Sequence, residues 1–169
     1  NWKLIGVSEH IKYLKNEIEY VAKKIKALDM AVLISGKNGT GKELIAEAIS
    51  EQSGRKPFVA INCAAFPGTL FESELFGYKK GAFTDGKVDK PGLIKAAEGG
   101  VLFLDEIGDL APEHQGKILR CLQERTVTPI GGREERINDI RIIAATNKDL
   151  SKQINEGKFR EDLFYRINH

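Results

Sequence analysis

The sequence predicts an α/β fold in which a mostly parallel β-sheet is covered by helices. The first observation behind this prediction is that short apolar runs, typical of buried strands, alternate with stretches of helical periodicity. The second is that the first of these runs ends in a Gly-rich turn that leads directly into a helix. The chain has 169 residues, of which 41% are apolar, and this length suits one domain with a substantial core.

The first predicted element is an amphipathic helix. Between Ser8 and Leu28 apolar residues recur at spacings of three and four, and the pattern stops at Asp29. This short extent favours a helix that faces the core over a dimerising coiled coil. A second helix is predicted around Leu44–Ile49. The predicted strands are Ala31–Ser35, Phe58–Ile61, Val101–Leu104 and Ile140–Ala145.

Two segments between these strands are irregular. Gly77–Pro91 is rich in Gly and Lys, and a connection of this length is usually functional or disordered. Thr126–Asn138 contains the adjacent glycines Gly131 and Gly132 and is typical of a small hairpin inserted before the last strand.

Composition argues against several classes of protein. The formal net charge of +2 is too small for a protein that coats nucleic acid through bulk electrostatics. Cys63 and Cys121 match no metal-ligand or redox spacing. No apolar run has the length that spans a bilayer, and the N-terminus lacks the apolar core of a signal peptide. We therefore expect a soluble, cytoplasmic protein that does not bind membranes.

A glycine-rich motif follows the first predicted strand and precedes a helix. In this context the glycines let successive backbone N–H groups point at phosphate oxygens, and the helix N-terminus adds its positive end. The motif lysine is placed to bridge the β- and γ-phosphates. The motif therefore predicts a site for a nucleoside triphosphate with Mg²⁺, in the first place ATP. Its residues are Gly36, Lys37, Asn38, Gly39, Thr40, Gly41, Lys42 and Glu43.

The last position of this motif departs from the general pattern. A Ser or Thr, whose hydroxyl coordinates Mg²⁺, normally follows the lysine, whereas this chain has Glu43. A carboxylate can reach the metal directly or through a water, so Glu43 is a candidate metal ligand.

Polar side chains stand at the ends of the other predicted strands, at the sheet edge where α/β proteins bind ligands. Asp105 is placed to hold Mg²⁺ through water, and Glu106 to act as the base that activates the attacking water. Asn147 is placed to orient that water or touch the γ-phosphate, and Asn62 to hydrogen-bond Glu106. Alone, such acids often only solvate a loop and such asparagines form turns, but the upstream motif favours function.

Arg160 and Arg166 lie six residues apart near the end of the chain. Composition leaves two interpretations open. Either the pair forms salt bridges on the surface, or one or both act as arginine fingers that neutralise transition-state charge on a nucleotide held by a neighbouring subunit.

Six segments, in this order, resemble a single family. They are GKNGTGKELIAEAI, PFVAINCAAF, ESELFGYKKGAFTDG, GGVLFLDEIGDL, RIIAATNKDL and GKFREDLFYRIN. The chain resembles the AAA+ ATPase domain of bacterial enhancer-binding activators, the NtrC-like partners of sigma-54 RNA polymerase. The resemblance covers essentially the whole of 1–169 and implies a sigma-54 interaction domain represented by its α/β subdomain.

The resemblance also implies roles for the polar residues. The family motif characteristically ends in Gly-Lys-Glu, which accounts for Glu43. The resemblance assigns phosphate binding to Lys42, and it assigns Mg²⁺ binding and hydrolysis to Asp105 and Glu106. Asn62 becomes a switch partner of Glu106, and Asn147 a sensor of the γ-phosphate. Arg160 and Arg166 become fingers donated across a subunit interface, so the resemblance implies self-association into a ring, usually a hexamer in relatives.

A partner-binding loop is implied within the first irregular segment. The residues Gly81, Ala82, Phe83, Thr84, Asp85 and Gly86 align with the family's GAFTGA loop, which contacts sigma-54 and moves during the ATP cycle. Phe83 and Thr84 are kept, whereas Asp85 and Gly86 replace Gly-Ala. The change adds a negative charge and removes a glycine's backbone freedom. The segment around Gly131 resembles the second loop that moves with the first.

Three further expectations concern function. The family's helical lid is absent, so the isolated chain should hydrolyse ATP poorly. DNA contact would require a helix-turn-helix domain that this chain lacks. Asp85 favours one alternative, a nucleotide-binding regulator that does not engage sigma-54, whereas a P-loop kinase or GTPase would need an acceptor site or guanine motif that the sequence does not show.

Overall fold

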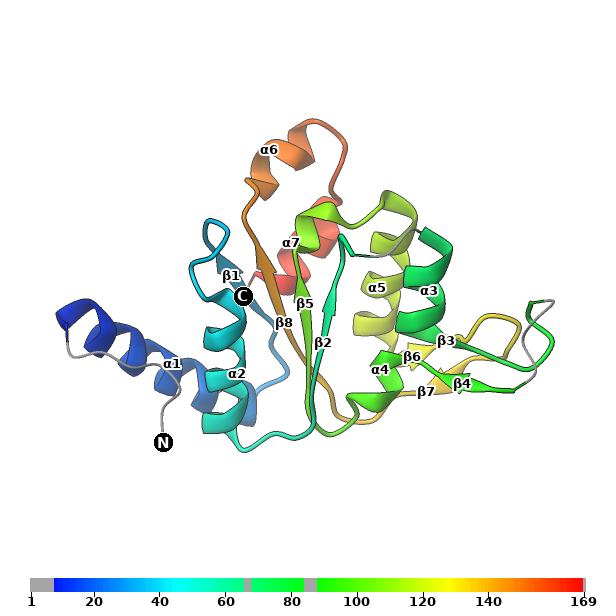
Figure 1. The fold of residues 1–169 in the computed structure, drawn as a ribbon, viewed down its shortest axis with the longest axis horizontal. Helices are drawn as coiled ribbons and strands as arrows, with labels where there is room; N and C mark the ends of the chain where they lie inside the picture. The colour runs from blue at the N-terminus through cyan, green and yellow to red at the C-terminus, as the bar shows by residue number, and fades with distance from the viewer. Residues whose placement is uncertain (1–7, 66–67, 84–87, 169) are drawn as a thin grey trace.

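The centre of the fold is a sheet of four parallel strands in the order β1-β8-β5-β2 (Figure 1). The structure, a computed structural model, describes residues 8–65, 68–83 and 88–168. The strands are β1 Val32–Ser35, β2 Phe58–Asn62, β5 Val101–Asp105 and β8 Arg141–Thr146. All four strands predicted from apolar runs are therefore present, each with bounds within one residue of the prediction, and the α/β class is confirmed.

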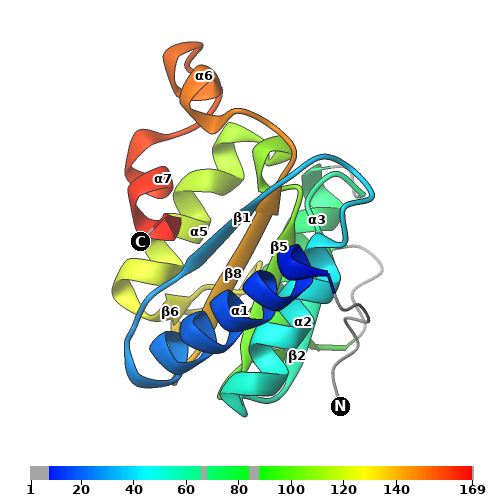
Figure 2. The same cartoon turned by 90° about the vertical axis from the view of Figure 1, so that its left-hand side faces the viewer.

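Helices cover both faces of this sheet. Helices α1 and α2 lie on one face, while α3, α4, α5 and α7 lie on the other, as Figure 2 shows for α1 and α2 in front of the strands. Helix α6 projects beyond the carboxyl edge of the sheet (Figure 1). The helices are α1 Glu9–Ala27, α2 Lys42–Ser53, α3 Gly68–Phe76, α4 Leu93–Ala96, α5 Pro112–Glu124, α6 Leu150–Asn155 and α7 Glu161–Ile167, with a 3₁₀ turn at Ile107–Asp109. None of these helices is long and apolar enough to cross a bilayer within the described part of the chain.

The apolar runs are continuous because the sheet is buried on both faces. In β5, Val101 and Phe103 pack against α1 and α2, whereas Leu102 and Leu104 pack with the helices of the opposite face. Strand β8 divides its side chains in the same way. The sheet is thus fixed from two sides, and its carboxyl edge is a rigid base for the residues that follow each strand.

Gly100, just before β5, packs backbone against backbone. A Cβ at this position would lie 1.9 Å from the carbonyl oxygen of Pro57, and Val101 N–H donates to the same oxygen at 2.8 Å. We expect Gly100→Ala to lower the free energy of unfolding by about 3 kcal/mol, because two strand ends must separate. Urea unfolding measures this change. Gly116→Ala, inside helix α5 and free of close contacts, should be neutral or stabilising, and equal midpoints for the two variants would contradict the prediction.

Both irregular segments contain short strands. β6 (Thr126–Val127) pairs antiparallel with β7 (Glu135–Arg136), which confirms the predicted hairpin. β3 (Gly77–Tyr78) pairs antiparallel with β4 (Lys90–Pro91), so the long connection is closed at its base, a feature that its composition did not predict. The connection and the hairpin lie side by side (Figure 1), joined by a bridge between Tyr78 and Ile130.

Candidate active site

The register of the sheet aligns the predicted site residues along one edge. Ser35, the last residue of β1, lies opposite Thr146, and Asn62 lies opposite Asp105. The loop that follows β1 is tied to the same edge, because Gly36 N–H donates to the carbonyl oxygen of Thr146 at 3.1 Å. The glycine-rich motif, the acidic pair and both asparagines therefore come together as predicted from strand order.

The glycine-rich motif forms a tight loop before α2. Gly39 and Gly41 have φ values of 76° and 82°, a left-handed conformation that favours glycine. The first regular helical hydrogen bond runs from Ile45 N–H to the carbonyl oxygen of Gly41 at 3.1 Å. The amides of the first turn before Ile45 have no carbonyl four residues earlier within the helix, so they are suited to bind an anion.

Lys42 is enclosed by this loop. Its side chain is 7% exposed, and its Nζ donates to the carbonyl oxygens of Gly36 at 3.1 Å and Lys37 at 3.3 Å. The same Nζ lies 3.4 Å from Oε1 of Glu106. Burying an ammonium group is costly unless it is paired, and here two carbonyls and one carboxylate serve that purpose. The loop thus holds a positive charge at the point where the helix also presents its positive end.

Glu106 connects the loop to the neighbouring strand ends. Its backbone has φ 51° and ψ 47°, a left-handed conformation that is rare outside glycine, Asn and Asp. Its N–H donates to Oδ1 of Asp105 at 3.0 Å, and its Oε2 accepts from the N–H of Asn147 at 3.3 Å. Such outliers persist only where the surroundings impose them, and they concentrate at functional sites. The carboxylate is thereby held between Lys42 and β8.

The two predicted asparagines behave differently. Asn147 donates from Nδ2 to Oδ1 of Asn38 at 2.6 Å, which links the end of β8 to the glycine-rich loop. Asn62 accepts with Oδ1 from the N–H of Ala64 at 2.8 Å and so stabilises its own turn. Among the described residues no hydrogen bond joins Asn62 to Glu106. The predicted switch contact is therefore not formed in this conformation, where Glu106 pairs with Lys42.

The acids at this edge also act on a neighbouring thiol. Burial, together with the charges of Asp105, Asp109 and Glu106, raises the pKa of Cys63 to about 12. The thiol therefore stays protonated at neutral pH and is a poor nucleophile. Chemistry at this edge must come from the carboxylates, the lysine and the amides.

The metal ligands suggested by the sequence lie in different settings. Glu43 is exposed in the first turn of α2, and Asp105 is partly buried at the end of β5. Within the described residues no cluster of three or more His, Cys, Asp or Glu side chains is arranged to hold a metal. Mg²⁺ is commonly held by one or two carboxylates together with water and substrate phosphates, and this donor set fits that mode.

Both arginines are paired with aspartates of their own chain. Arg160 is exposed and forms two hydrogen bonds with Asp162, at 2.9 and 2.7 Å. Arg166 is less exposed, and its Nη2 donates to the carbonyl oxygen of Leu122 at 3.2 Å and to Oδ2 of Asp29 at 3.5 Å. In the described part of the chain, no hydrogen bond or ion pair connects either arginine to the loop or to Glu106. The side-chain hydrogen bonds of both arginines thus run to residues other than the predicted site residues of their own subunit.

The predicted partner loop is described in part. Thr84, Asp85 and Gly86 lie outside the described residues, whereas Phe83 is 43% exposed and contacts Tyr78 edge to face, with ring centroids 5.6 Å apart. The loop also includes Gly81 and Ala82.

The base of this loop is bound to the hairpin. Lys79 N–H donates to the carbonyl oxygen of Ile130 at 3.0 Å, and Ile130 N–H donates to the carbonyl oxygen of Gly77 at 2.9 Å. The Lys79 side chain forms ion pairs with Glu135 at 3.0 Å and Asp89 at 3.6 Å. From the sequence, the loop segment and the hairpin were associated only through the family resemblance. The role of Lys79 in joining them was not predicted, because nothing in the sequence distinguishes Lys79 from the chain's many other lysines.

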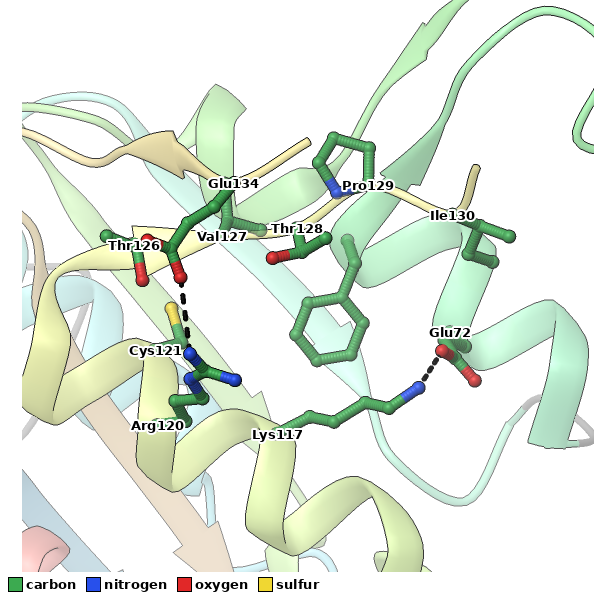
Figure 3. A pocket seen from close by; sticks show the side chains of 11 residues that line it. Glu72, Lys117, Arg120, Cys121, Thr126, Val127, Thr128, Pro129, Ile130 and Glu134 are labelled. Carbon is green, nitrogen blue, oxygen red and sulfur yellow. Dashed lines mark hydrogen bonds and ion pairs between the residues drawn. The ribbon is translucent and has the colours of Figure 1, made fainter. Parts of the chain in front are cut away.

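A cavity of about 350 Å³ lies elsewhere, between α3, α5 and the hairpin (Figure 3). Ion pairs between Lys117 and Glu72 and between Arg120 and Glu134 stand at its rim. None of the predicted site residues lines it. Its lining residues are Glu72, Phe76, Lys117, Arg120, Cys121, Thr126, Val127, Thr128, Pro129, Ile130 and Glu134.

Comparisons with known proteins identify the family. Residues 4–169 match the family described as Sigma-54 interaction domain. The response regulator protein PilR of Pseudomonas aeruginosa is 48% identical over 168 residues, which are 98% of this chain and 37% of PilR. The DNA-binding transcriptional regulator NtrC of Rhizobium meliloti is 51% identical over 154 residues, which are 90% of this chain and 32% of NtrC.

Solved structures of a relative have the same fold as this chain. A crystal structure of NtrX from Brucella abortus has a TM-score of 0.87 and 40% identity, covering 98% of this chain and 36% of NtrX. NtrX in complex with ATP has a TM-score of 0.86 and 39% identity, covering 100% of this chain and 37% of NtrX. This chain thus spans about a third of the length of these relatives. Given the match over residues 4–169 and the shared fold, the chain belongs to the Sigma-54 interaction domain family.

Proposed function

We propose that this chain binds ATP with Mg²⁺, hydrolyses it within a ring of subunits, and uses the cycle to remodel sigma-54 RNA polymerase in the bacterial cytoplasm. The observation that carries the proposal is the connected set Lys42, Glu106, Asn147 and Asn38, which joins the glycine-rich loop to two strand ends. Family membership and the crystallisation of the relative NtrX with ATP and with ADP support it.

Lys42 binds the phosphates in this proposal. Its Nζ now contacts the carbonyl oxygens of Gly36 and Lys37 and the carboxylate of Glu106 at 3.1 to 3.4 Å, and phosphate oxygens would replace these oxygens as its partners. The amides of the loop and of the first turn of α2 supply further donors. Bound Mg²⁺ would neutralise charge on the β- and γ-phosphates, with Asp105 holding it through water and Glu43 as a second candidate ligand.

Glu106 is the proposed general base. Once Lys42 turns to phosphate, the Glu106 carboxylate is free to accept a proton from the attacking water, and the γ-phosphoryl group passes to that water with ADP as the leaving group. Asn147 contacts both Glu106 and Asn38, so it is placed to sense whether a γ-phosphate is present. In another state of the ATP cycle, Asn62 breaks its hydrogen bond with the N–H of Ala64 and instead binds the Glu106 carboxylate.

A second subunit completes the proposed site. Among the described residues, Arg160 and Arg166 form no hydrogen bond or ion pair with the loop of their own subunit, which suits groups that act on the nucleotide of a neighbour. An arginine finger stabilises the charge that develops on the transferred phosphoryl group. Each interface is then head-to-tail, a type that generates a ring when the rotation between subunits closes, and we expect a ring of six subunits.

A pull-down tests the sigma-54 part of the proposal. The full-length protein, loaded with ADP and a γ-phosphate transition-state analogue, is expected to retain sigma-54 polymerase, whereas Phe83→Ala should retain about tenfold less because an exposed aromatic anchor is lost. Val88→Ala, which removes another exposed apolar side chain, is the control. Failure of the parent protein to retain sigma-54, under conditions where its ring is intact, would contradict this function.

Asp85 favours a second candidate function, a nucleotide-binding regulator that does not engage sigma-54. A charged residue at a tip that must dock against a partner carries a desolvation cost. If the parent fails to open sigma-54 promoters and the double substitution Asp85→Gly with Gly86→Ala creates that activity, the second function is supported. Promoter opening by the parent protein would exclude it.

A further inference from the structure

Asp29 occupies an unusual position in the charge distribution of the fold. It lies in the connection between α1 and β1, and its carboxylate is the shared partner of three arginines from distant parts of the chain. Arg125 contacts Oδ1, Arg166 lies 3.5 Å from Oδ2, and Arg141 lies 3.9 Å from Oδ1. Partial burial raises the pKa of Asp29, but Arg125, Arg166 and Arg141 together hold it below its usual value. The carboxylate therefore stays charged at neutral pH.

Arg125 and Arg141 are anchored independently of Asp29. Arg141 is 8% exposed, and its Nε donates to the carbonyl oxygens of Ile25 at 2.9 Å and Leu28 at 2.8 Å, at the end of α1. Arg125 donates from Nη1 to the carbonyl oxygen of Ile140 at 3.1 Å. These two guanidinium groups are thus fixed parts of the fold.

Arg166 is held far less firmly. Its hydrogen bonds within the described residues both come from Nη2, at 3.2 Å to Leu122 and at 3.5 Å to Asp29, and both are long for a charge-assisted contact. Departure of Arg166 would leave Asp29 paired with Arg125. Of the three arginines, Arg166 is the one that can leave at low cost.

We propose that Asp29 holds Arg166 in the isolated subunit, and that Arg166 exchanges Asp29 for the nucleotide phosphates of the neighbouring subunit when two subunits pack. This inference rests on the proposed function. Asp29 is then a positioning residue whose ion pair with Arg166 opposes assembly of the shared site. Arg160 is held by Asp162 in a comparable way, through two hydrogen bonds of 2.9 and 2.7 Å on the exposed surface of α7.

The test follows ATP turnover per subunit of the full-length protein as the subunit concentration is raised. Asp29→Asn preserves the side-chain size and one oxygen acceptor but removes the charge. We expect the concentration at half-maximal turnover to fall about two- to fivefold, the range of an exposed ion pair, with the saturating turnover unchanged. Adding Arg166→Ala to this variant should abolish turnover at every concentration.

Asp139→Asn is the matched control. Asp139 pairs with Arg141 and Arg55 in the same region, and within the described residues it makes no ion pair with Arg166. Its half-maximal concentration should equal that of the parent. An unchanged value for Asp29→Asn, or the same shift in both variants, overturns the proposal.

A second measurement covers the case in which Asp29→Asn folds poorly. At concentrations too low for assembly, Arg166→Ala should unfold at a lower urea concentration than the parent, because the contacts with Asp29 and Leu122 are lost. An equal midpoint would show that Arg166 is not held in its own subunit and would overturn the proposal. Absence of turnover by the parent at any concentration would overturn both this proposal and the proposed function, whereas the other adverse outcomes contradict only the role of Asp29.

Discussion

Glu106→Gln is expected to bind ATP at least as tightly as the parent and to hydrolyse it about 10² to 10⁴ times more slowly. The amide cannot accept the proton of the attacking water, so the chemical step loses its base. Binding should persist because the substitution also removes the carboxylate that lies 3.4 Å from Lys42 Nζ and competes with phosphate for that ammonium group. Calorimetric titration with ATP and measurement of phosphate release separate the two effects.

Two variants control this experiment. Glu113→Gln changes an exposed acid in the first turn of α5 and should leave binding and turnover unchanged. Lys42→Ala removes the buried ammonium group and should abolish binding itself. Normal phosphate release by Glu106→Gln would assign the base to another group and would sink the mechanism proposed above.

Mixing two inactive variants is expected to restore ATP turnover. Arg160→Ala subunits can bind ATP and retain Glu106 but offer a defective finger, so their own rings should lose about 10³-fold or more in turnover. Glu106→Gln subunits lack the base but still offer Arg160. In a mixed ring, an Arg160→Ala site that faces a Glu106→Gln neighbour receives an intact finger, which makes about a quarter of the interfaces competent at equal mixing.

The mixing experiment is controlled by the ratio of the two variants and by a double variant. Turnover is measured against the ratio of the two variants at constant total subunit concentration. A double variant with both substitutions in one chain should show no recovery when it is mixed with either single variant. In one mixture every subunit lacks Arg160, and in the other every subunit lacks Glu106. If Arg160→Ala and Glu106→Gln never complement each other, the arginine acts within its own subunit, and the shared site is wrong.

The sheet and its edge could be predicted because their signals are local. A strand buried on both faces is predominantly apolar, so Val101–Leu104 and Ile140–Ala145 were recognisable as short runs. Parallel strand ends necessarily share one edge, and this geometry placed Asp105, Glu106 and Asn147 near Lys42. No long-range contact had to be known for either step.

Other features depend on contacts between distant residues and left no such signal. The two-residue strands β3 and β4 have no periodicity to detect, and they pair because Gly77 and Gly92 let two backbones approach closely. The left-handed backbone of Glu106 is imposed by its surroundings. The direction of the Asn62 side chain follows from a local turn that competes with the predicted contact.

The arginines show the same limit. Sequence alone left salt bridges and fingers as alternatives, and in the isolated subunit both arginines do form ion pairs, with Asp162 and Asp29. The two interpretations are compatible if these pairs are the resting contacts of groups that act across an interface. Resemblance to a family indicates which arginines contact the nucleotide. The contacts of the folded chain indicate which ion pairs these arginines must break before they can do so.

The central claim is that a competent site needs two subunits. The most direct test is the specific ATPase activity of the full-length protein, expressed per subunit, over a wide range of subunit concentrations. The claim predicts that specific activity is low in dilute solution and rises with concentration to a plateau as rings form. Specific activity that is constant over the whole range, for a protein shown by light scattering to be monomeric at its lower end, would contradict it.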